Sequence, residues 1–162
     1  MKKFELTSES IVNIFGKKLF RIKALIEFGN VKEGELGGFI EKEENLSHEG
    51  DAWVYGDAEV CGNAEVCGDA KVSGDAKVFG NAWVCGDAEV CGNADYATVK
   101  GFGTEFRATT FFRCKDGVVR VRCGCFYGDL GQFRSQVKDT RKGKIAEEYL
   151  MIADLIEKHF DK

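Results

Sequence analysis

The sequence predicts a mainly β fold: a short parallel β-helix, capped by an N-terminal β-hairpin and followed by a C-terminal β-hairpin and two α-helices. Three features of the 162-residue chain support this prediction. Seven tandem hexads begin at Asp51, alternating apolar residues flank two glycine-containing turns, and apolar residues recur at helical spacing near the C-terminus. The chain therefore divides into a cap over residues 1–50, repeats over 51–98 and a C-terminal module over 99–162.

The first fifty residues are expected to cap the repeats. The run IVNIFGKKLFRIKAL holds two alternating apolar segments on either side of Gly16-Lys17-Lys18, which is typical of a β-hairpin. The next stretch, VKEGELGGFIEKEENLSHEG, leads into the repeats, and its Gly37-Gly38 pair predicts a turn. A short repeat array needs such a capping segment to be stable.

Each hexad reads Asp or Asn, Ala, a variable residue, Val, a second variable residue and Gly, as in DAEVCG. The alanine and the valine point to the same face of an extended strand, so they form the predicted core and the variable residues point outward. Glycine followed by Asp or Asn turns the chain, because these residues tolerate the positive φ of tight corners. A four-residue strand and a two-residue corner, repeated, wind into a parallel β-helix.

In the C-terminal module, Asp116-Gly117 predicts a type I′ turn that closes a β-hairpin within TTFFRCKDGVVRVRCGCF. The residue pairs that such a two-residue loop predicts are Cys114 with Val119, Arg113 with Arg120, and Phe111 with Arg122. Two helices are expected to follow, over about residues 129–139 and 144–160, where apolar residues recur at helical spacing.

The hexads resemble those of the left-handed hexapeptide-repeat β-helix proteins, in which an aliphatic residue is followed four places later by a small one. Seven consecutive pairs match, from Val54 with Ala58 to Val90 with Ala94. The resemblance implies a left-handed triangular prism with three hexads per coil, so that residues 18 apart stack. The outward columns that it implies include Asn63 over Asn81, Glu59 over Lys77, and Cys67 over Cys85.

The whole layout is similar to a group of hexapeptide-repeat proteins encoded by phages and prophages of bacteria. The stretches GELGGFIEKEENLSHEGDAWVYG, TTFFRCKDG and CGCFYGDLGQF carry this similarity, beside the repeats. It implies a viral origin and a place in the cytoplasm of an infected or lysogenic bacterial host, and it brings no known activity. No apolar run reaches membrane-spanning length, which agrees with this expectation.

Charge is divided unevenly along the chain: residues 27–100 carry a net −11 and residues 101–144 a net +6. Arginines that face each other across the predicted hairpin repel, so a negative partner is expected. The partner is either an anionic ligand, such as a nucleotide, a nucleic acid or an acidic host protein, or carboxylates of the chain itself, from the repeats or Glu147-Glu148. The candidate ligand-binding residues are Phe111, Arg113, Lys115, Arg120, Arg122 and Arg134.

The seven cysteines do not predict a metal site. Those of the repeats point outward on all three sides of the prism, whereas a tetrahedral site needs four ligands around one point. These four are Cys61, Cys67, Cys85 and Cys91. The remaining Cys114, Cys123 and Cys125 lack an obvious fourth ligand. We therefore expect reduced thiols, no metal and no cofactor.

Three functions fit these features. The preferred one is a non-enzymatic binding protein, a host-takeover or anti-defence factor that binds a host protein or an anionic nucleotide or nucleic acid. The second is an acyltransferase, which the hexapeptide-repeat resemblance implies, with His48 or His159 as its general base. The third is a structural module that forms a homodimer or homotrimer through exposed Trp53 and Trp83. Binding is preferred because the chain lacks a catalytic motif and a loop long enough to build a substrate cleft.

Overall fold

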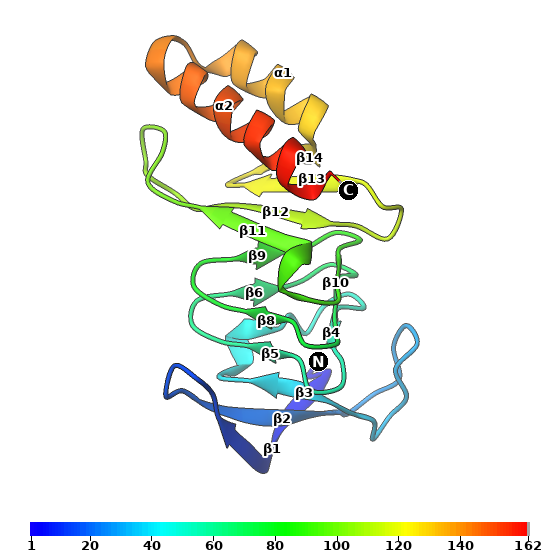
Figure 1. Cartoon of the computed structure of the whole chain (residues 1–162). Coiled ribbons are helices and arrows are strands. Elements are labelled where there is room, and N and C mark those ends of the chain that lie inside the picture. Colours follow the sequence, from blue (N-terminus) through cyan, green and yellow to red (C-terminus); the bar gives the residue numbers. More distant parts are fainter. Residues whose placement is uncertain (162) are drawn as a thin grey trace.

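The computed structural model describes residues 1–161 and shows a mainly β molecule with two C-terminal helices. The chain builds a column from one end to the other: the N-terminal sheet, a stack of short strands, a second sheet, and the helix pair (Figure 1). No helix within these residues is long and apolar enough to cross a membrane.

The N-terminal segment forms an antiparallel sheet that continues directly into the repeats. Its elements are β1 (Phe4–Val12), β2 (Lys18–Ala24), β3 (Leu36–Ile40) and the 3-10 turn η1 (Glu43–Asn45). The predicted hairpin is confirmed, since β1 pairs antiparallel with β2. Strand β3 pairs antiparallel with β2 on one side and parallel with β5 (Glu59–Val60) on the other, which joins the cap to one side of the stack.

The turn predicted at Gly37-Gly38 is wrong, because both glycines lie inside β3. Neither has a positive φ. They are required for close approach instead: a Cβ on Gly37 would lie 2.6 Å from the Val54 carbonyl oxygen, and one on Gly38 would lie 2.5 Å from that of Ala58. The cap therefore sits so tightly on the first coil that only a residue without a side chain fits.

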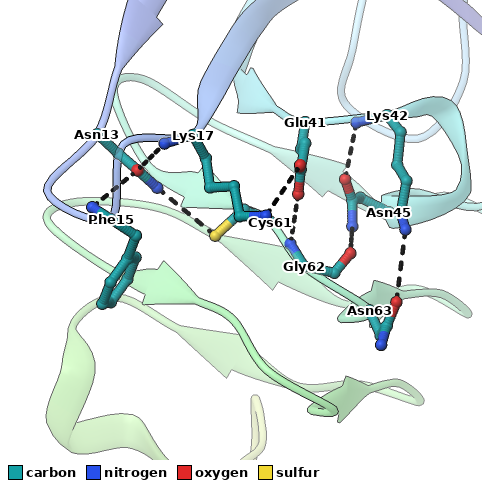
Figure 2. A network of polar contacts seen from close by, with 9 residues as sticks. All are labelled: Asn13, Phe15, Lys17, Glu41, Lys42, Asn45, Cys61, Gly62 and Asn63. Atoms are coloured by element: carbon teal, nitrogen blue, oxygen red, sulfur yellow. Dashed lines mark hydrogen bonds and ion pairs between the residues drawn. The ribbon is translucent and has the colours of Figure 1, made fainter.

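Polar side chains of the cap satisfy backbone groups of the second hexad (Figure 2). A Glu41 carboxylate oxygen accepts a hydrogen bond from the Gly62 amide at 2.8 Å. The buried Asn45 amide donates to the Gly62 carbonyl at 3.1 Å, and Asn13 donates to the Cys61 sulfur at 3.6 Å. In a longer stack, the next coil would form hydrogen bonds with these groups, and here side chains of the cap take its place. The cap therefore covers the apolar core at this end of the stack and also satisfies polar groups there.

The repeats form three short parallel sheets, one on each side of the stack. The strands are β4 (Trp53–Val54), β5, β6 (Glu65–Val66), β7 (Lys71–Val72), β8 (Lys77–Val78), β9 (Trp83–Val84) and β10 (Glu89–Val90). Strands three apart pair in parallel, as in β4-β7-β10, β5-β8 and β6-β9. Each pairing joins residues 18 apart, for example Val54 with Val72, which confirms the expected stacking period.

The interior of the stack consists of the alanine and valine of every hexad. All seven valines are fully buried, and the alanines are at most 1% exposed. Outside, the Asn63 side chain donates to that of Asn81 at 3.5 Å, and Lys77 lies 3.0 Å from a carboxylate oxygen of Glu59. The predicted core and these two outward columns are confirmed.

The two tryptophans of the repeats differ from the expectation that both are exposed. Trp53 is fully buried, because the cap covers it: its ring meets those of Phe28 and Phe4 edge-on at centroid distances of 5.3 and 6.3 Å. Trp83 is partly buried beneath the guanidinium of Arg122, 3.9 Å from the ring centroid. A docking surface built on both tryptophans is therefore wrong.

The C-terminal module is a four-stranded antiparallel sheet with two helices. It comprises the 3-10 turn η2 (Asn93–Asp95), β11 (Tyr96–Val99), β12 (Thr109–Arg113), β13 (Val119–Cys123), β14 (Phe126–Asp129), α1 (Leu130–Thr140) and α2 (Gly143–Phe160). The sheet lies between the last coil and the helix pair (Figure 1). Both predicted helices are confirmed to within one residue at their N-terminal ends, and Asp129 caps α1 by accepting from the Gln132 amide at 2.7 Å.

The predicted β12-β13 hairpin exists, but its register is wrong by one residue. The loop has three residues, 115–117: the Cys114 amide donates to the Val118 carbonyl at 3.0 Å, and Gly117 adopts φ +82°. The observed pairs are Arg113 with Val119, Phe112 with Arg120, Phe111 with Val121, and Thr110 with Arg122. A shift of one residue in one strand changes which side chains share a face of the sheet.

Lys3 is buried in the cap with its ammonium group enclosed. Its Nζ donates to the carbonyl oxygens of Ala52 at 2.8 Å and Gly50 at 3.2 Å, and lies 4.6 Å from the ring centroid of Phe28. Burial outweighs the attraction of the Asp51 and Asp69 carboxylates and lowers the pKa of Lys3 to about 8. In the unfolded chain a lysine titrates near pH 10.4.

We expect Lys3 to stabilise the fold increasingly as the pH rises from about 8 to about 10. In this window the unfolded chain keeps the proton that the native lysine has released, so deprotonation favours the native state. Relative to Lys3→Met, the wild type should gain about 2 kcal/mol between pH 8 and pH 10. Urea unfolding of both proteins at several pH values measures this, and a difference that stays constant with pH would contradict it.

Candidate functional site

The structure does not bring the predicted ligand-binding residues onto one face. Because of the shifted register, Phe111 and Arg113 lie on the side of the sheet that meets the helices, and Arg120 and Arg122 lie on the side that meets the coils. Lys115 is exposed in the hairpin loop, and Arg134 lies on α1. Phe111 is fully buried against Phe133, at a centroid distance of 6.1 Å, so base stacking on Phe111 is excluded.

Carboxylates of the chain hold three of these four arginines. Arg113 pairs with Asp95 at 3.2 Å, and Arg134 pairs with Asp154 at 2.9 Å and with Glu157 at 3.3 Å. Arg120 forms two parallel hydrogen bonds with Asp116, at 2.9 and 2.8 Å. This fork lowers the pKa of Asp116 to about 2. The predicted basic face is thus wrong as a single site, and three of its four arginines are paired with carboxylates of the chain.

A cavity of about 200 Å³ lies elsewhere in the module, between the loop over residues 100–108, strands β13 and β14, and both helices. Four aromatic residues, two arginines and two cysteines are among the residues that line it. The residues concerned are Phe102, Phe126, Phe133, Tyr149, Arg107, Arg141, Cys123 and Cys125. Tyr149 and Phe133 meet edge-on at 5.9 Å, which sets a rigid angle between two of these rings.

The loop that covers the cavity is held close to the helices. Gly103, at φ +79°, approaches so closely that a Cβ there would lie 2.5 Å from the Tyr149 hydroxyl. Phe106 is the one residue other than glycine with positive φ within residues 1–161, and its side chain is 64% exposed. Such strain in a bulky residue is found most often next to ligand sites.

The two arginines of the cavity differ in how they are held. Arg107 forms an ion pair with Glu105 of the same loop, and both side chains are largely exposed. The Arg141 backbone amide ends α1 by donating to the Val137 carbonyl at 2.8 Å, and its exposed side chain has no ion-pair partner in the described part of the chain. Burial raises the pKa of Tyr149, so its hydroxyl keeps its proton beside these charges.

Sequence reasoning missed Arg107, Arg141 and Tyr149 as neighbours. They come from three separate segments, and only the folded module places them around one cavity. The available signal was limited to the stretch GFGTEFRA, an aromatic- and glycine-containing segment without the periodicity of a strand or helix.

The two candidate general bases lie far apart in the fold: His48 borders a shallow hollow beside Cys67 and Trp83, and His159 lies near the end of α2. His48 accepts a hydrogen bond from the Lys3 amide at 3.1 Å and stacks on Phe4 at a centroid distance of 4.2 Å. His159 packs edge-on against Phe160 at 5.1 Å.

Among residues 1–161, no three His, Cys, Asp or Glu side chains gather closely enough to hold a metal ion.

No protein-family model matches this chain, and no curated protein matches its sequence.

Proposed function

We propose that the chain is a non-enzymatic binding protein whose ligand is a small aromatic anion of the nucleotide class. The observation that supports this most directly is the cavity of about 200 Å³, whose lining combines four aromatic residues with Arg107 and Arg141. This volume is below the range of about 300–1,000 Å³ that is usual for ligand pockets, so the cavity would hold only part of a nucleotide. Arginine forks bind phosphates bidentately, and aromatic side chains stack on bases.

In this proposal the repeats are a left-handed parallel β-helix of the hexapeptide-repeat type, and they form a rigid scaffold for the C-terminal module. The similarity to phage and prophage proteins supports a role in the cytoplasm of an infected or lysogenic bacterium. A protein that holds a nucleotide without converting it acts by sequestration, which suits a host-takeover or anti-defence factor. The acyltransferase alternative finds less support, because both histidines are engaged in packing contacts.

Calorimetric titration with adenosine and guanosine mono- and triphosphates tests the proposal. We expect Arg107→Ala and Arg141→Ala each to weaken binding at least tenfold, since a hydrogen bond to a charged group contributes about 1.5–3 kcal/mol. Arg134→Ala is the matched control, because Asp154 and Glu157 already engage its guanidinium on the outer side of the helices. The proposal fails if no nucleotide binds the wild type, or if Arg134→Ala weakens binding as much as Arg141→Ala.

A further inference from the structure

Two cysteines of the repeats are stacked on the side of the column that β6 and β9 form. Glu65 pairs with Trp83 there, and the Cys67 amide donates to the Val84 carbonyl at 2.9 Å, which places Cys67 directly beside Cys85. Neighbouring strands lie about 4.8 Å apart. This spacing falls within the range of about 4.4–6.8 Å between the Cα atoms of disulfide-bonded cysteines.

Cys67 has an environment that stabilises a thiolate. The Trp83 indole Nε1 donates a hydrogen bond to its sulfur at 3.1 Å. The Arg122 guanidinium, 3.9 Å from the centroid of the same indole, adds a positive charge behind this donor. The Nε of Arg122 is buried and has no hydrogen-bond partner, so its charge is not balanced by a carboxylate at that atom.

The pKa values of the two thiols diverge in agreement with this geometry. A hydrogen bond from Cys85, with help from Trp83 and Arg122, lowers the pKa of Cys67 to about 7. The same hydrogen bond, together with burial, raises the pKa of Cys85. Near neutral pH a substantial fraction of Cys67 is therefore thiolate, while Cys85 remains a thiol.

The two sulfurs also differ in access. Cys85 is 4% exposed, whereas Cys67 is partly exposed and borders a shallow hollow whose wall includes Leu46, Glu65 and Trp83. Glu43, Glu44 and His48 also line the hollow, and Lys2 pairs with Glu43 at 2.8 Å. An acidic wall disfavours an anionic reagent such as glutathione and admits a small neutral oxidant.

We propose that Cys67 and Cys85 form a redox site that reacts with hydrogen peroxide and closes to a disulfide. The Cys67 thiolate attacks one peroxide oxygen, the O–O bond breaks, and the departing hydroxide takes a proton to become water. Cys67 is then a sulfenic acid. The Cys85 sulfur attacks the Cys67 sulfur and loses its proton, the S–O bond breaks, and the oxygen leaves as a second water. Two thiols are oxidised and one peroxide is reduced.

The disulfide would act at the junction between the coils and the C-terminal module. It would link two consecutive coils covalently and turn the thiolate that accepts from Trp83 into a neutral disulfide sulfur, which is a weaker acceptor. Trp83 contacts the module twice, through Arg122 above its ring and through its backbone amide, which donates to the Thr110 hydroxyl at 2.9 Å. Oxidation of the two cysteines would therefore alter the contacts that Trp83 makes with the β12-β13 hairpin.

Peptide mapping of the full chain after treatment with one equivalent of hydrogen peroxide tests the proposal. Free thiols are alkylated and the protein is digested with trypsin without reduction. We expect a disulfide that joins the peptides of residues 43–71 and 78–100, with fragment ions assigning it to Cys67 and Cys85. In Cys85→Ala, a sulfenic acid on Cys67 should persist and be trapped by dimedone. A disulfide between other cysteines, or none, would overturn the proposal.

Alkylation rates at pH 7 test the thiolate separately. Trp83→Phe keeps a ring beneath Arg122 but removes the N–H donor, and we expect alkylation of Cys67 to slow about tenfold. Cys91 is the internal control, because it has the same position in its hexad, is exposed, and receives no side-chain hydrogen bond on its sulfur in the described part of the chain. If Cys67 in the wild type reacts no faster than Cys91, the site is not a stabilised thiolate and the proposal fails.

Discussion

Replacing Trp53 of the first coil by alanine is expected to lower the free energy of unfolding by about 4 kcal/mol, the largest effect that we expect of any single truncation where the cap meets the repeats. The side chain is fully buried between the first coil and the N-terminal sheet. Its ring contacts those of Phe28 and Phe4, and the backbone around it is fixed by the parallel pairing of β4 with β7. Because these elements are tied together, they close only partly over the space that alanine leaves. Urea unfolding measures the loss.

Two further variants separate ring volume from other contributions. The Trp53 indole Nε1 is buried without a hydrogen-bond partner, so Trp53→Phe removes no polar contact and should cost far less than the alanine variant. Trp83→Ala removes a partly exposed ring from the same hexad position and should cost about 1–2 kcal/mol. Equal losses for Trp53→Ala and Trp83→Ala would mean that the cap does not hold Trp53 as the structure describes.

The repeats could be predicted from sequence because every determinant is local. Each Val and Ala occupies the interior whichever hexad it belongs to, and the glycines of the first six hexads turn the corners with positive φ. The turn predicted at the cap glycines was wrong because their role depends on contacts with residues distant in the sequence. Gly37 and Gly38 have the composition of a turn, and only contact with the backbone of Val54 and Ala58 requires them in a strand.

The arginine site predicted on the hairpin was less predictable, because it depends on the register between β12 and β13, and a shift of one residue separates its members. Asp116-Gly117 suits a two-residue type I′ loop, and the same glycine also suits the positive φ position of a three-residue loop. Packing of Phe111 against the helices and of Phe112 against the coils selects the second. The three-residue loop places the hairpin arginines on different faces of the sheet from those predicted. The cavity at Arg107 and Arg141 is formed by segments that are far apart in the sequence, so the sequence did not predict it.

The second large effect is expected for Gly38→Ala, which should lower the free energy of unfolding by about 3 kcal/mol. The added methyl would lie 2.5 Å from the Ala58 carbonyl oxygen and 2.7 Å from a Val54 methyl carbon. Neither can move freely, because Val54 pairs with Val72 in β7 and the Ala58 carbonyl accepts from the Phe39 amide at 2.9 Å. The cap must therefore lift from the first coil, and urea unfolding should show the loss.

Lifting the cap would also expose the first coil as an unpaired edge, which is a template for association with other chains. We therefore expect Gly38→Ala to increase self-association, as measured by light scattering at temperatures below the unfolding transition. Gly92→Ala is the matched control: Gly92 has an ordinary φ of −162°, and a Cβ there would meet nothing within 4 Å. It should change stability by less than about 0.5 kcal/mol. If Gly38→Ala unfolds and associates no more readily than Gly92→Ala, the close contact between cap and coil does not stabilise the column.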